Sequence, residues 1–508
     1  MKITKKFEFY FLIISLILLY SSFFIHIKFK DISFEQLLFT ISTSKGANFS
    51  ILFTGIFFVL SLIIITILIL FLIYKLYNFL NKKNDPKQYE IKLFKHSRLI
   101  SILVTILFCI FCFILSFNLL HINDYINAQL SSSKLFEENY VDGKKNKIEF
   151  PENKRNLIYI YAESLEATNF SIENGGLVQD SYIPNLEKLA LENINFSHNN
   201  KLGGAIQVNN THWTMAALVA HTAGIPLKIS VTSNHYKGFS DSLPGVYNLG
   251  DILNENGYNN FFMLGSDADF GGRKDFFERH GNYVIYDYYY AKKENYIDKD
   301  YRVWWGYEDA KLFKFAKEKI LEAHKLGKPF NFTLLTADTH FRDGYMDASC
   351  EKKFKSKYAN SFYCSDNKII EFINWIKEQK FYENTTIVIA GDHLTMNSNF
   401  YNDNNYQRTI YNTFINSPIT PIKDKNRLFT TFDLFPTTLA SLGVKIEGNK
   451  LGLGVNLFSE EQTLLEKIGL DKFNDEISKK SFYYDNVLLG NTYYEMQEKR
   501  KNKEYILK

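Results

Sequence analysis

Acidic and histidine side chains follow two apolar runs of the sequence, where they could hold a metal ion. The run TTIVIAG, residues 385–391, leads into Asp392 and His393, and the run LIYIYA, residues 157–162, leads into Glu163. Two carboxylates and one imidazole form a mostly oxygen-based ligand set that suits Mn²⁺ or Mg²⁺, with Zn²⁺ as an alternative. For each residue alone, the simpler explanation is a turn or a solvated loop charge.

Polar side chains also follow two further apolar runs. FNFTLLT, residues 330–336, is followed by Asp338 and His340, and NFFML, residues 260–264, is followed by a glycine-rich polar turn that continues to Arg273. In parallel sheets, functional side chains collect beyond the carboxyl ends of the strands. The residues that follow these four apolar runs are therefore predicted to lie at one edge of the sheet, which would carry acids, histidines and an arginine.

Thr214 is a candidate nucleophile for such a site. It stands at the head of an apolar helical stretch within residues 211–227, which Gly224 and Pro226 terminate. A helix start offers unpaired N–H groups and a positive dipole end for a phosphate, and a divalent metal makes a coordinated hydroxyl more acidic. On the local sequence alone, a role as the helix N-cap is the simpler explanation of this threonine.

The runs that precede these side chains alternate with helical patterns. Helices are expected at Tyr247–Glu255, at Glu308–Leu326 and at Asp366–Lys380, the last with Asp366 as its N-cap. Strands that alternate with helices of this length predict an α/β domain with a largely parallel central sheet and helices on both faces. We expect this domain to occupy residues 156–508.

Three apolar runs precede the α/β region, at Phe9–Ile27, Ile51–Ile73 and Leu99–Leu120, and none contains Asp, Glu, Lys or Arg. Each is close to the ~20 residues that span a bilayer, so residues 1–121 are predicted to form a three-helix transmembrane region. Residues 122–155 are expected to form a juxtamembrane helix and a linker. Lys and Arg are more frequent before the first run and between the second and third than between the first and second, which places everything after Leu120 outside the cytoplasm.

The net charge bears on the kind of binding partner, and the cysteines bear on the cellular compartment. The net charge of +4 is too small to indicate a nucleic-acid partner. Cys350 and Cys364 are the only cysteines outside the apolar runs. A bridge between them would suit an extracytoplasmic compartment, and two free thiols are the alternative.

The outer region resembles the membrane-anchored phosphoglycerol transferases of the alkaline phosphatase superfamily. These include the phosphoglycerol transferases of osmoregulated periplasmic glucans and the lipoteichoic acid synthases. The matching stretches, in chain order, are NLIYIYAESLEATNF, HWTMAALVAHTAGIPL, LGDILNENGYNNFFMLGSDADFGGRKDFFERHG, FTLLTADTHF, the Cys350 and Cys364 pair, and AGDHLTMN. A weaker likeness extends to about residue 458. The order and spacing of these stretches together make the resemblance specific.

The resemblance implies a sulfatase-like catalytic domain with one divalent metal, commonly Mn²⁺, with Mg²⁺ or Zn²⁺ as alternatives. It assigns four metal ligands, namely Glu163, Thr214, Asp392 and His393. Thr214 would also be the nucleophile, and Arg273 and His340 would bind the substrate phosphate, with His340 alternatively a leaving-group acid. Asp267, Asp269 and His212 lie near these residues in the sequence pattern, and no role is assigned to them.

The implied enzyme is a phosphotransferase that moves glycerol phosphate from phosphatidylglycerol to an envelope glycan or polymer through a glycerophosphoryl-threonine. It would be a multi-pass protein of the bacterial inner membrane, with its catalytic domain on the periplasmic or extracytoplasmic side. Two alternatives share the superfamily, a phosphoethanolamine transferase and a sulfatase-like hydrolase. The sulfatase pattern of Cys or Ser before x-P-x-R is absent. A catalytically inactive membrane protein that binds envelope glycans is an alternative of another class.

Overall fold

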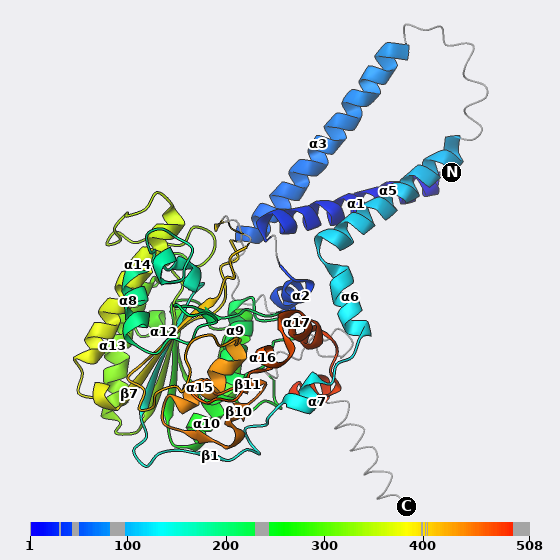
Figure 1. Ribbon diagram of the computed structural model, residues 1–508. Coiled ribbons are helices and arrows are strands. Elements are labelled where there is room, and N and C mark those ends of the chain that lie inside the picture. The colour runs from blue at the N-terminus through cyan, green and yellow to red at the C-terminus, as the bar shows by residue number, and fades with distance from the viewer. Residues whose placement is uncertain are drawn as a thin grey trace, which may run out of the picture. The chain divides into compact units, whose positions relative to one another are not determined.

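Figure 1 shows the computed structural model of the chain. The residues that it describes are 2–29, 32–42, 50–81, 97–228, 243–397, 400–401, 403 and 405–490. The chain forms two compact units. The N-terminal unit comprises Met1–Leu37 and Ala47–Asn127, and the C-terminal unit comprises Leu38–Gly46 and Ala128–Lys508.

The N-terminal unit is built on three long apolar helices, α1 (Lys2–Lys28), α3 (Ser50–Asn81) and α5 (Ser97–Leu119). Within the described residues, three segments are long and apolar enough to cross a membrane, namely Glu8–Lys28, Leu52–Leu76 and Ile102–Leu119. Helix α1 packs against both α5 and α3, and most other apolar side chains of these helices are exposed. A helix that is apolar on all sides is typical of a membrane span, so the three predicted spans agree with the structure.

The C-terminal unit is built around a seven-stranded sheet with the strand order β3-β8-β7-β2-β6-β4-β5. The bounds are β2 (Asn156–Ala162), β3 (Gly204–Ala205), β4 (Asn259–Leu264), β5 (Val284–Tyr286), β6 (Phe330–Leu335), β7 (Thr385–Gly391) and β8 (Ile410–Ile415). The five strands from β7 to β5 are mutually parallel, while β8 runs antiparallel to β7 and β3 antiparallel to β8. The predicted, largely parallel sheet is therefore confirmed.

Helices cover both faces of this sheet, because its central strands are apolar on both faces. In β2, Leu157, Tyr159 and Tyr161 enter one core cluster, and Ile158 and Ile160 enter the other. The first cluster includes helices α9 (Thr214–Ala223), α10 (Leu249–Glu255) and α15 (Leu434–Ala440). The second includes α8 (Pro184–Glu192), α13 (Asp309–Lys325) and α14 (Lys357–Lys377). Figure 1 shows these two helical layers on opposite sides of the sheet.

Helix α14 differs from its prediction at its start. It begins at Lys357 rather than at Asp366, and Ser356 is its N-cap because its side chain accepts the N–H of Ala359. The Asp366 carboxylate instead accepts the backbone N–H groups of Asn185 and Leu186 at the start of α8. The prediction that Asp366 caps its own helix was wrong, since this carboxylate caps a neighbouring helix.

Part of the predicted linker contributes to the C-terminal unit. Residues 122–155 contain helix α6 (Ile122–Leu130), the short helix α7 (Leu135–Asn139) and strand β1 (Ile148–Glu149). Strand β1 pairs with β9 (Lys445–Ile446), and the side chains of α7 residues Leu135 and Phe136 are buried in the first core cluster. Apolar burial and strand pairing therefore tie the chain after α6 to the C-terminal unit.

Cys350 and Cys364 form a disulfide, with their Cα atoms 5.3 Å apart. Cys364 lies in α14, and Cys350 lies in the loop between β6 and α14 that also carries His340. The bridge therefore joins this loop to a helix of the second core cluster.

Reduction of this disulfide should lower the stability of the C-terminal unit. A bridge across a sequence separation of 14 residues contributes about 3 kcal/mol in the chain-entropy model. We expect the double variant Cys350→Ser/Cys364→Ser to lower the free energy of unfolding by about that amount. Urea unfolding of the full chain in detergent, with and without reductant, measures it.

The matched control for this experiment is Cys109→Ala, because Cys109 is a free thiol of helix α5. The control should retain the sensitivity of the parent protein to reductant, and the double variant should have none. Equal stability of the oxidised parent and the double variant would contradict a stabilising bridge.

Candidate metal centre and nucleophile

Glu163, Asp392 and His393 lie together at the carboxyl ends of the adjacent parallel strands β2 and β7. One ligand atom from each residue lies within 4.8 Å of the others, and all three residues are buried. The Nε2 atom of His393 is 3.6 Å from a Glu163 carboxylate oxygen and 3.4 Å from Oδ2 of Asp392. The strand register pairs Ala162 with Gly391, so the next residue of each strand, Glu163 and Asp392, reaches the same level of the sheet edge.

Hydrogen bonds orient the ligand atoms of this cluster. Oδ1 of Asp392 accepts the backbone N–H groups of Ser164 and His393, each at 2.8 Å, whereas Oδ2 is buried without a partner among the described residues. Nδ1 of His393 donates to the Leu394 carbonyl at 2.8 Å, which leaves Nε2 as an acceptor facing the two carboxylates. An unpaired buried carboxylate oxygen beside a second carboxylate and an acceptor nitrogen fits a divalent cation.

The electrostatics of the cluster also fit a cation. Burial and, to a smaller extent, the Glu163 carboxylate raise the pKa of Asp392 to about 7, against the opposing effect of His393. Burial lowers the pKa of His393, but Asp392 and Glu163 more than offset this and raise it overall. In both shifts, the contribution of the neighbouring carboxylates reflects two negative charges close together in a buried site, which a divalent cation would neutralise.

Ser164 supports two of these ligands. Its hydroxyl donates to Oε1 of Glu163 at 2.7 Å, and its N–H donates to Asp392. These contacts require a left-handed backbone, with φ of 54° at Ser164, which costs about 1–2 kcal/mol for a residue other than glycine. Sequence reasoning missed Ser164, because the residue type alone carries no sign of this conformation.

Thr214 is the first residue of α9 and is half-buried. The N-cap is Trp213, whose side chain makes no capping hydrogen bond, so the explanation of Thr214 as an N-cap was wrong. Among the residues that the structure describes, none forms a hydrogen bond with the Thr214 hydroxyl. This hydroxyl therefore stands at a helix start with its donor and acceptor capacity unused by the fold.

His221 connects α9 with strand β2 of the sheet. It lies seven residues after Thr214, about 10 Å along the helix, and its ring contacts the rings of Tyr159 and Tyr161. Its Nδ1 is 2.9 Å from the Tyr159 hydroxyl. Burial lowers the pKa of His221 to about 3, although a hydrogen bond to the Asp392 backbone opposes the shift, so the ring is neutral. Its helix position gave no sign of this contact.

Arg273 is the first residue of α11 (Arg273–Arg279) and is buried. Its Nη2 donates to the Asp267 carbonyl at 2.7 Å, while its Nε is buried without a partner in the described chain. Burial lowers the pKa of Arg273 to about 10, and the charges of Asp267 and Glu163 oppose this, so the guanidinium stays charged at neutral pH. Arg273 therefore places a positive charge near Glu163, and the carbonyl of Asp267 orients it.

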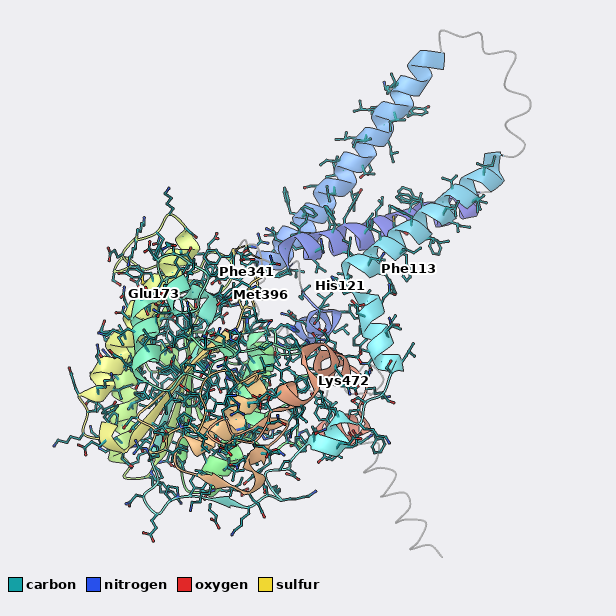
Figure 2. The ribbon with its side chains drawn as sticks, viewed as in Figure 1. Phe113, His121, Glu173, Phe341, Met396 and Lys472 are labelled. Atoms are coloured by element: carbon teal, nitrogen blue, oxygen red, sulfur yellow. A yellow bond between two sulfur atoms is a disulfide. The ribbon has the colours of Figure 1, made fainter. Side chains whose placement is uncertain are left out.

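His340 follows β6 and is half-buried. Its Nδ1 donates to the Phe341 carbonyl at 2.7 Å, because a carbonyl oxygen only accepts, and Nε2 remains for another partner. The hydroxyl of the preceding residue, Thr339, donates to the Glu163 carbonyl, which ties this loop to the end of β2. Figure 2 labels Phe341 and Met396, from the loops after β6 and β7, and both lie at the upper end of the sheet in that view.

Asp338 shares a strand end with His340 but belongs to the scaffold. Its carboxylate pairs with Lys368 of α14 at 2.8 Å and accepts the N–H of Asp309 at 3.2 Å. Lys368 also pairs with Asp347 at 2.7 Å. This buried ion-pair cluster, together with the disulfide, holds both ends of the loop that carries His340.

Comparison with known proteins assigns the chain to a family. The family model described as Sulfatase matches residues 155–444, which is more than half of the chain. The chain belongs to the sulfatase family. The match extends over all strands of the central sheet and over every predicted metal ligand.

Proteins that are similar to this chain in sequence carry a more specific name than the family model does. Phosphoglycerol transferase I of Escherichia coli O6:K15:H31 is 37% identical over 257 residues, which cover 49% of this chain and 32% of that protein. Phosphoglycerol transferase I of Escherichia fergusonii is 32% identical over 332 residues, which cover 64% of this chain and 38% of that protein. The chain thus spans about a third of the length of these relatives. The resemblance expected from the sequence motifs is confirmed.

A solved structure aligns with part of this chain at lower sequence identity. A protein of the alkaline phosphatase superfamily from Vibrio parahaemolyticus aligns with a TM-score of 0.48 at 22% identity, covering 61% of this chain and 74% of that one.

Cysteine placement separates this member of the sulfatase family from sulfatases that convert a cysteine to formylglycine. Cys350 and Cys364 are bridged, and the two remaining cysteines, Cys109 and Cys112, lie in helix α5 of the N-terminal unit.

A buried ion pair fixes the loop that follows His393. Arg408 binds both carboxylate oxygens of Glu166, at 2.8 and 2.6 Å, and Glu166 also accepts the N–H of Thr395. Bidentate, charge-assisted pairs of this kind set geometry as well as energy. Glu166 lies three residues after Glu163, so the segment after β2 supplies both a candidate metal ligand and an anchor for the loop that follows Asp392 and His393.

Proposed function

We propose that the protein is a metal-dependent phosphoglycerol transferase, which moves glycerol phosphate from phosphatidylglycerol to an extracytoplasmic glycan or polymer. The observation that carries this proposal is the buried cluster of Glu163, Asp392 and His393, whose ligand atoms lie within 4.8 Å of one another with excess negative charge. The name shared by the relatives supports the glycerol phosphate group as the one transferred.

The cation would be held by Glu163, Asp392 and His393 together with the Thr214 hydroxyl, and Mn²⁺ is the ion that we propose. When bound, such an ion lowers the pKa of a coordinated hydroxyl and offsets phosphate charge. The N–H groups at the start of α9 and the Arg273 guanidinium bind the non-bridging oxygens of the phosphodiester. Fixed donors of this kind supply most of the stabilisation in phosphoryl transfer.

In the first step, the Thr214 oxygen, which is deprotonated before the attack and again after the second step, attacks phosphorus, and the bond from phosphorus to the diacylglycerol oxygen breaks. The leaving oxygen takes a proton from Nε2 of protonated His340, whose ring is oriented by the Phe341 carbonyl. The products of this step are diacylglycerol and a glycerophosphoryl-threonine.

In the second step, an acceptor hydroxyl attacks phosphorus, the Thr214 oxygen leaves, and neutral His340 takes the proton of the acceptor at Nε2. Each step therefore reverses the protonation state of His340, which returns the site to its starting form.

A lipid donor accounts for the N-terminal unit, because three spanning helices would keep the site at the membrane where phosphatidylglycerol resides. The distribution of Lys and Arg, and the disulfide of the C-terminal unit, support a bacterial inner-membrane location with the site on the periplasmic or extracytoplasmic side.

The test reconstitutes the full chain with Mn²⁺ in vesicles that contain head-group-labelled phosphatidylglycerol or phosphatidylethanolamine. We expect diacylglycerol and labelled glycerol phosphate products from phosphatidylglycerol, lost on addition of EDTA. Turnover of phosphatidylethanolamine alone would establish the phosphoethanolamine transferase alternative. The absence of turnover of both lipids, with hydrolysis of a soluble ester, would favour the sulfatase-like hydrolase.

A further inference from the structure

Two sets of side chains in the aromatic stretch 283–307 differ in their burial. Tyr283, Tyr286, Tyr288 and Tyr307 are buried core residues. Trp304 and Trp305 are only half-buried and occupy the tip of a hairpin. Core packing explains these four tyrosines, whereas the two tryptophans at the hairpin tip require another explanation.

The hairpin tip is rigidly anchored at the site rim. Val303 and Gly306 exchange two backbone hydrogen bonds of 2.9 Å, so Trp304 and Trp305 are the two turn residues. Gly306 forms a bridge with Ser266, and a Cβ on Gly306 would lie 2.1 Å from the Gly265 carbonyl oxygen. The hairpin therefore sits against the glycine-rich turn after β4, which leads to Arg273.

The turn that carries the two tryptophans has an unfavourable backbone conformation at Trp304. Trp304 has φ of 51°, in the left-handed region that two-residue turns usually fill with Gly, Asn or Asp. Its indole N–H donates at 3.1 Å to the carbonyl of Ala337, three residues before His340. Backbone strain in a structure that holds it firmly is characteristic of functional sites.

Trp305 lies between the two residues proposed to handle the phosphate. Its ring meets the His340 ring edge to face at 4.8 Å and stacks on Phe270 at 5.9 Å. The Arg273 guanidinium lies 5.5 Å from the centre of the same Phe270 ring. In the described part of the chain, the Trp305 indole N–H has no hydrogen-bond partner. Trp305 thus offers the site an apolar face and one unused donor.

We propose that Trp305 is the acceptor platform, which binds a sugar ring of the acceptor and presents its hydroxyl to His340. A pyranose ring has an apolar C–H face and hydroxyls around its edge, and both match an indole with a free N–H. An acyl chain has no acceptor for the indole N–H of Trp305, and a glycerol unit is too small to cover the indole ring. This inference rests on the proposed function for its chemistry, and on the hairpin for its location.

The test measures sugar binding and transfer separately. The full chain in detergent is titrated calorimetrically with a neutral gluco-oligosaccharide and with the linear polyol sorbitol, and transfer from phosphatidylglycerol to the same oligosaccharide is measured against hydrolysis. The variants are Trp305→Ala and Trp305→Phe, and the control is Tyr289→Ala, which alters an exposed ring of the same stretch.

We expect Trp305→Ala to weaken oligosaccharide binding by about tenfold and to lower the ratio of transfer to hydrolysis by a similar factor, with Trp305→Phe between. The control should match the parent, and sorbitol should bind more weakly than the oligosaccharide. The inference is overturned if Trp305→Ala leaves binding and this ratio unchanged, or if sorbitol binds as well as the sugar. Absence of transfer with Trp305-dependent sugar binding would reject the proposed function alone.

Discussion

Asp392→Asn should abolish metal-stimulated turnover and remove the rise in melting temperature that Mn²⁺ gives the parent protein. Oδ1 of an asparagine can still accept the N–H groups of Ser164 and His393, so the local backbone is retained. The amide nitrogen would take the place of Oδ2, the unpaired buried atom that faces Nε2 of His393. A donor then stands where the cation needs an acceptor.

The melting temperature of the Asp392→Asn variant also distinguishes loss of metal binding from loss of the folded structure. Removing one carboxylate relieves its repulsion with Glu163, which contributes to the raised pKa of Asp392, so without metal Asp392→Asn should melt at or above the temperature of the parent. Binding to the native state alone raises stability by mass action, and this rise should disappear. Thermal melts with Mn²⁺ or EDTA measure both effects, and turnover should fall by about 10³-fold or more.

Asp343→Asn is the matched control, since it makes the same change at an exposed position three residues after His340. It should retain both turnover and metal-dependent stabilisation. Retention of the Mn²⁺ effect by Asp392→Asn would show that the cation binds elsewhere.

Thr214→Ala should reduce turnover by about 10⁵-fold, because loss of a covalent nucleophile removes the whole two-step route. Its hydroxyl makes no hydrogen bond to a described residue, and alanine favours helix more than threonine does, so stability should be unchanged or higher. Diacylglycerol release from vesicles measures the rate. Thr214→Ser should recover part of it, since serine restores the hydroxyl.

Thr222→Ala controls for the helix itself. Thr222 lies in the same helix, and its hydroxyl donates to the Leu218 carbonyl at 2.6 Å, away from the helix start. This variant should turn over at nearly the rate of the parent. A normal rate in Thr214→Ala would mean that another group attacks phosphorus.

The sheet and three of the proposed ligands could be predicted because their signals are local. LIYIYA and TTIVIAG are continuously apolar, as strands covered on both faces must be, and their polar successors reach one sheet edge through parallel register. The three apolar N-terminal helices were predictable for the same reason, since length and composition suffice to identify them.

The supporting residues could not be predicted, because their partners are distant in sequence. Glu166 and Arg408 are 242 residues apart, and Ser164 and Asp392 are 228 apart, so no local pattern joins them. The start of α14 was misplaced because Asp366 is a good capping residue that caps another helix. The aromatic residues of 283–307 suggest sugar stacking and core packing equally from the sequence, and only the hairpin distinguishes Trp305 from its buried neighbours.

The most direct measurement is an anomalous-scattering map from crystals of the protein grown with Mn²⁺. The account predicts one peak bound by Glu163, Asp392 and His393, with the Thr214 hydroxyl oxygen as a further ligand. A peak that lacks Thr214, or a Mn²⁺ site away from these strand ends, would contradict it.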